Sequence, residues 1–126
     1  MDNSIEERLK EIRIEDFIWL VYIGIIFLSW YSNELERRYF IYKDNYSKEK
    51  YRKIMILIFS ILVIVYYYFL NDSISSINNL SSNVSYEKRR LNYLSMIASL
   101  FIFISGLILL YIAINDKDID VELAFN

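Results

Sequence analysis

The sequence predicts an all-α integral membrane protein, a bundle of three transmembrane helices that extend beyond the bilayer, preceded by an amphipathic N-terminal helix. Hydrophobic residues make up 56% of the 126 residues and aromatic residues 17%, above the roughly 45–50% apolar share of soluble domains. All thirty charged residues lie outside three uncharged blocks. We expect one membrane domain, 1–126, with these segments: amphipathic helix 1–16, span 17–32, basic tyrosine-rich loop or helix extension 33–53, span 54–70, Ser/Asn-rich loop 71–90, span 91–114 and acidic tail 115–126.

The N-terminal segment carries six acidic and three basic residues, a balance that is not typical of a signal peptide. Ser4 and Glu7 form a capping box, and Ile5, Leu9 and Ile12 share one helical face. Two interpretations are open. The segment is either an interfacial helix that lies on lipid or a straight extension of the first span.

The three uncharged blocks predict the spans. A helix of a small soluble protein carries charges on its outer face, whereas these blocks are apolar around their whole circumference. At helical rise they span roughly 24, 26 and 36 Å, against a hydrocarbon core of about 30 Å. The first two blocks are short, so flanking basic residues such as Arg13 and Lys50 must reach back to the interface along their aliphatic stems.

Aromatic side chains lie at both ends of the blocks, where Trp and Tyr concentrate in membrane proteins. An AT-rich genome would explain the number of tyrosines but not their positions. The predicted membrane-interface residues are Trp19, Trp30, Tyr31, Tyr51, Tyr66, Tyr67, Tyr68, Tyr93 and Tyr111.

The segment between the first two spans is basic, and its residues Leu35, Tyr39, Tyr42 and Tyr46 recur at helical spacing. We therefore expect the helix of the first span to continue past the membrane. Aromatic residues among basic ones also occur in RNA-binding segments, but a solvated helical extension explains them better.

The segment between the second and third spans is rich in Ser and Asn and suggests a flexible loop. Its apolar residues Ile74, Ile77, Leu80 and Val84 nevertheless follow a helical spacing that continues into the third block. This spacing indicates that the third helix can begin before the membrane.

Basic residues decide the orientation. The 33–53 segment and the C-terminal tail together hold eight Lys and Arg residues, and the N-terminal segment and the 71–90 loop hold six. The positive-inside rule therefore predicts the N-terminus outside and the C-terminus in the cytoplasm.

Composition also bounds the chemistry. The chain has no Cys and no His, and no block contains an ionisable Asp, Glu, Lys or Arg, so we expect no enzyme, no metal and no cofactor. A net charge of −2 gives no basis for nucleic-acid binding.

Small residues Ser95, Ser99, Gly106 and Ala113 form a stripe on the third block. Such a stripe lets helix backbones approach within lipid, and we interpret it as a helix-packing face. The alternative is that its hydroxyls line the pore of an oligomer.

Two functions follow from these features. The first is a non-enzymatic, self-associating structural or accessory subunit, whose partners are the lipid bilayer and either further copies or other membrane subunits. The second is a homo-oligomeric pore or channel. In size and span count the chain is similar to three-span phage holins, although no motif supports the resemblance and the acidic tail NDKDIDVELAFN departs from their basic tails.

Overall fold

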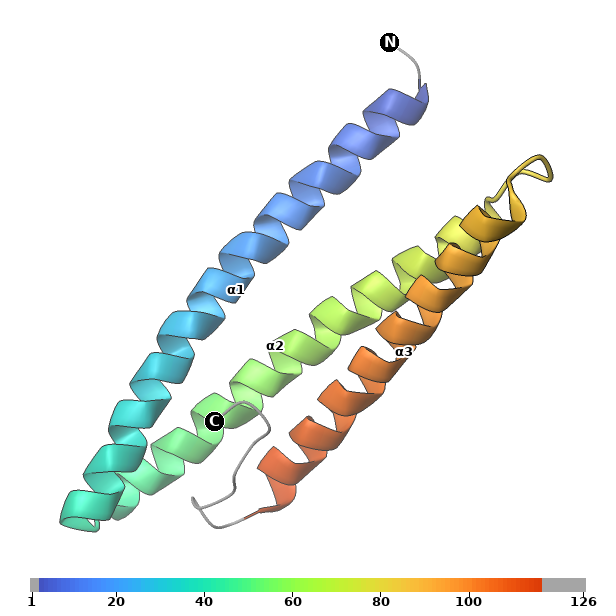
Figure 1. Ribbon diagram of the computed structural model, residues 1–126. Helices are drawn as coiled ribbons and strands as arrows, with labels where there is room; N and C mark the ends of the chain where they lie inside the picture. The colour runs from blue at the N-terminus through green and yellow to red at the C-terminus, as the bar shows by residue number, and fades with distance from the viewer. Residues whose placement is uncertain (1–2, 117–126) are drawn as a thin grey trace. The chain divides into compact units, whose positions relative to one another are not determined.

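The computed structural model describes residues 3–116, and this part of the chain is helical apart from two short connections, with no strand (Figure 1). The helices are α1, Asn3–Tyr42, α2, Asn45–Asn78, and α3, Tyr86–Asn115. They hold 40, 34 and 30 residues, and no proline interrupts them. At helical rise each is longer than the roughly 30 Å hydrocarbon core of a bilayer. The prediction of an all-α protein is confirmed.

The chain divides into two compact units, Met1–Tyr51 and Arg52–Asn126. The first unit holds α1 and the first two turns of α2. The second unit holds the rest of α2 together with α3.

In the first unit, α1 runs without a break from Asn3, so the described part of the predicted N-terminal helix is the beginning of a longer one. Ile5, Leu9 and Ile12 are exposed. Arg8 pairs with Glu11 at 3.0 Å, along one helix face. The structure therefore has a straight extension of the first apolar block rather than a separate helix.

A two-residue connection separates α1 from α2, so nearly all of the 33–53 segment is helical. Lys43, the residue after α1, has a φ of 54°, in the left-handed region that commonly terminates helices. The Asp44 carboxylate then accepts hydrogen bonds from the Tyr46 backbone N–H at 3.1 Å and from the Ser47 hydroxyl at 2.8 Å. Asp44 thereby caps α2.

In the second unit, α2 and α3 lie side by side and are joined by a short turn (Figure 1). The Ser/Asn-rich loop is shorter than predicted, because residues 71–78 complete α2 and residues 86–90 begin α3. Ser85 caps α3 by accepting from the Lys88 N–H at 3.2 Å. The apolar spacing within this segment and the lack of proline let the helices continue.

By length and composition, two of the helices in the described chain, α2 and α3, could cross a membrane. The most apolar part of α2 is 22% buried and that of α3 only 6%. The core helix of a soluble protein is mostly buried, and α3 in particular is not. α1 is not among the candidates: its uncharged block is 16 residues long, and a span needs about 20.

Candidate functional site: the α2–α3 contact and a lysine–tyrosine cluster

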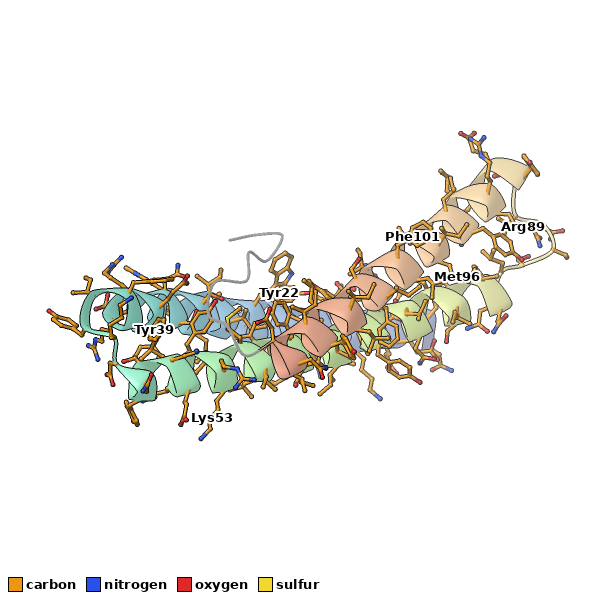
Figure 2. The ribbon with its side chains drawn as sticks, turned by 90° about the horizontal axis from the view of Figure 1, so that it is seen from below. Tyr22, Tyr39, Lys53, Arg89, Met96 and Phe101 are labelled. Carbon is orange, nitrogen blue, oxygen red and sulfur yellow. The ribbon has the colours of Figure 1, made fainter. Side chains whose placement is uncertain are left out.

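Large apolar side chains on α3 are exposed around the helix. Gly106 is the one buried residue of this fully described helix. Figure 2 shows side chains on all sides of α3, with Phe101 on the side away from α2. The exposed large aliphatic and phenylalanine side chains of α3 are Leu91, Leu94, Ile97, Leu100, Phe101, Ile102, Ile104, Leu107, Ile108 and Ile114. Such a surface is suited to contact with lipid or with other helices rather than with water.

The α2–α3 contact is closest at Gly106. A Cβ atom at this position would lie 2.9 Å from Tyr66 Cδ2 and 3.5 Å from Val63 Cγ2. The first distance is shorter than real Cβ contacts, so only glycine fits without a shift of the tyrosine ring. Gly24 in α1 differs, because a Cβ there would meet nothing within 4 Å.

A hydrogen bond between two serine hydroxyls joins α2 and α3 one heptad away from the contact at Gly106. Ser73 Oγ lies 3.1 Å from Ser99 Oγ and also donates to the Phe69 carbonyl at 2.9 Å. A hydroxyl has one proton, so Ser99 is the donor to Ser73. The pairs 73–99 and 66–106 are separated by seven residues on each helix, the interval at which packed helices repeat their contacts.

Arg52 fixes the other end of the α2–α3 contact. Its Nε donates to the Asp116 carbonyl at 3.0 Å, and Nη2 lies 3.4 Å from the Ile114 carbonyl. The last carbonyls of a helix have no partner within the helix and carry partial negative charge. A guanidinium is therefore a favourable partner for the C-terminus of α3.

The structure divides the predicted stripe of small residues. Ser99 and Gly106 face α2 of the same chain, Ala113 is half-buried and Ser95 is exposed. The stripe is visible in the sequence, but its partners on α2 were not predicted; they are Val63, Tyr66 and Ser73. The seven-residue repeat that two packed antiparallel helices share is the sequence signal from which these partners could have been predicted.

The predicted membrane-interface aromatics differ in how far they are exposed. Tyr51 is buried, with 6% of its surface exposed, and Tyr66 and Tyr68 are half-buried. The Tyr67 ring packs against Phe103 at 5.8 Å between centroids. The exposed members are Trp19, Trp30, Tyr31, Tyr67, Tyr93 and Tyr111.

The first unit contains a second feature, a lysine–tyrosine cluster formed by Tyr31, Tyr39, Tyr46, Lys48 and Lys50. The Lys48 ammonium lies 5.4 Å from the centroid of the Tyr39 ring. The Lys50 ammonium lies 5.3 Å from the Tyr31 ring and 5.8 Å from the Tyr46 ring. A hydrogen bond with the Tyr31 side chain and the charge interaction between the two groups raise the pKa of Lys50 above its usual 10.5. The basic and tyrosine residues are visible in the sequence, but the contacts between them were not predicted.

Within residues 3–116, no group of three carboxylates is placed to hold a metal ion. In the same part of the chain, buried side-chain nitrogen and oxygen atoms all have hydrogen-bond partners. No known protein family, curated protein or solved structure matches the chain.

Proposed function

We propose that the chain is an integral membrane protein with three spans, residues 17–32, 54–70 and 91–114. In this proposal it is a non-enzymatic structural or accessory subunit that self-associates within a membrane complex. The observation that carries the proposal is that α3 is apolar on all sides, while its most apolar part is only 6% buried. Exposure to water costs about 25 cal/mol for each Å² of apolar surface. Lipid removes that cost.

The first span is supported by the side chains around the middle of α1. Its apolar block is shorter than the hydrocarbon core by roughly 6 Å at helical rise. Because α1 continues at both ends of the block, Arg13 can reach the interface along its aliphatic stem. The exposed large apolar residues of the block are Phe17, Trp19, Leu20, Ile23, Ile26, Phe27, Trp30 and Tyr31.

Self-association is supported by small residues of α3 that α2 leaves uncovered. Ser95, Ala98 and Ser105 are exposed, and small side chains let a second helix approach closely within lipid. The pore is less well supported, because Ser99, one of the serines whose hydroxyls would line it, already contacts α2 of the same chain.

Reconstitution of the purified chain into liposomes tests the proposal. We expect chemical cross-linking to trap dimers or larger assemblies, and we expect an encapsulated dye to stay inside as in protein-free liposomes. Ala98→Leu and Ser105→Leu should reduce cross-linking, because each replaces a small side chain with a large one. Ile104→Leu replaces one large exposed side chain with another and should not reduce it. Dye release that depends on the protein would favour the pore, and a chain that stays monomeric would overturn self-association.

A further inference from the structure

The lysine–tyrosine cluster lies next to the second proposed span along α2. Lys48 and Lys50 precede Ile54, the first residue of the uncharged block, by six and four residues in one continuous helix. At helical rise these separations are about 9 and 6 Å. If the block spans the hydrocarbon core, both ammonium groups lie at the depth of the lipid headgroups.

The tyrosine side chains orient the two ammonium groups and leave part of their hydrogen-bonding capacity for another group. A ring attracts a cation through its face, and an ammonium has three N–H donors. Lys50 forms side-chain hydrogen bonds with Tyr31 and Tyr46, and its third N–H is left for a further acceptor. Lys48 and Lys50 are both half-exposed, so such an acceptor can reach them.

Basic residues outnumber acidic ones around the two lysines along α2. Asp44 accepts hydrogen bonds from the start of α2, and Glu34 pairs with Arg38 at 3.6 Å. Glu49, between the two lysines, is exposed. Across residues 43–53 five basic residues face two acidic ones.

We propose that the lysine–tyrosine cluster binds the phosphate of anionic phospholipid headgroups and enriches these lipids beside α2. The inference rests on the proposed membrane insertion. The ammonium groups supply the charge, and the Tyr31 and Tyr46 side chains stand beside them as hydrogen-bonding groups at the headgroup level. A basic residue at an anionic membrane surface contributes enough attraction to change the local lipid ratio about five-fold, which corresponds to ~1 kcal/mol.

The two native tryptophans make the test specific. Trp30 is next to Tyr31 of the cluster, whereas Trp19 is eleven residues earlier in α1, about 16 Å at helical rise. We would prepare the full chain as Trp19→Phe and as Trp30→Phe and reconstitute each into vesicles of phosphatidylcholine and phosphatidylglycerol. Only one lipid at a time carries brominated acyl chains, which quench nearby tryptophan.

We expect brominated phosphatidylglycerol to quench Trp30 more than brominated phosphatidylcholine does at equal mole fraction, and to quench Trp19 no more than phosphatidylcholine does. Lys48→Gln with Lys50→Gln should abolish the preference, while Lys10→Gln with Lys88→Gln, which removes the same charge elsewhere, should preserve it. Equal quenching by both lipids at Trp30 overturns the inference and leaves the insertion intact. Absence of quenching by either lipid at both tryptophans overturns the insertion itself.

Salt separates a bound headgroup from a bound free anion. Sodium chloride and sodium phosphate at equal ionic strength should weaken the preference equally through screening. If phosphate removes the preference and chloride does not, free phosphate occupies the cluster and the assignment to a lipid headgroup is wrong.

Discussion

Gly24 and Gly106 are the two glycines of the chain, and both lie within helices where glycine costs about 1 kcal/mol relative to alanine. Only Gly106 has a packing reason for this cost, because Tyr66 occupies the space that a Cβ would need. The sequence placed Gly106 on a contact face. It could not show which ring filled the space, because this depends on the register between α2 and α3.

Alanine at the two glycines should therefore have opposite effects. Gly24→Ala should stabilise the protein by about 0.5–1 kcal/mol, the gain in helix propensity with nothing in the way. Gly106→Ala should be neutral to destabilising by about 2 kcal/mol, because overpacking costs about 1–3 kcal/mol and offsets the same gain. Unfolding in mixed micelles, followed by circular dichroism, measures both. Equal stabilisation by the two variants would contradict the close contact at Gly106.

Serine hydroxyls form two kinds of hydrogen bond in this chain, within one helix and between two helices. Ser60, the polar residue in the middle of the second block, donates to the Ile56 carbonyl of its own helix at 2.7 Å. Ser73 and Ser99 instead meet across two helices. All three look alike in the sequence, and only the helix pairing separates them.

A double-mutant cycle on the helix pair should detect this difference. Ser73→Ala and Ser99→Ala should show a coupling of about 1 kcal/mol, the typical net contribution of an intramolecular hydrogen bond. Ser60→Ala with Ser99→Ala should show none, because the Ser60 hydroxyl is satisfied within α2. The same unfolding assay supplies both cycles. Purely additive effects of Ser73→Ala and Ser99→Ala would argue against the bond between α2 and α3.

At the scale of whole helices, apolar spacing predicted the elements better than composition did. The Ser/Asn-rich segment suggested a loop over 71–90, yet α2 runs to Asn78 and α3 begins at Tyr86. Ser and Asn have only a weak preference against helix, and tertiary contacts such as that of Ser73 with Ser99 outweigh it. The sequence also left open whether the N-terminal segment was a separate helix. No local signal between it and the apolar block marked the continuity of α1.

Arg52 should control the end of α3. Arg52→Met removes the donors to the Ile114 and Asp116 carbonyls, so the last turn of α3 should fray and its amides should exchange hydrogen faster. Lys53→Met is the matched control, because Lys53 is exposed and points away from the helix in Figure 2. Hydrogen exchange read by mass spectrometry on peptides from residues 107–116 reports the change. Faster exchange in both variants, or in neither, would show that Arg52 does not cap α3.

For the whole molecule, the described chain provides two helices that could span a membrane, and the sequence proposes a third within α1. The block in α1 differs from the other two helices because it is too short to span a bilayer by itself. The 16-residue block needs its flanks to reach both interfaces, and only the interaction with lipid decides whether it does. The span count is therefore the central claim. We propose in addition that residues 33–53 lie in the cytoplasm, because the positive-inside rule favours that side for this basic segment.

Site-directed labelling tests that claim most directly, because the native chain has no cysteine. Single cysteines at Asn3, Asn45 and Ser76 would be exposed to a membrane-impermeant maleimide in intact cells, with permeabilised cells as the control for reactivity. Three spans with the N-terminus outside predict labelling at Asn3, protection at Asn45 and labelling at Ser76. Asn3 and Asn45 with the same accessibility and Ser76 with the opposite one would reduce the protein to two spans, and labelling of all three would contradict a membrane-spanning protein altogether.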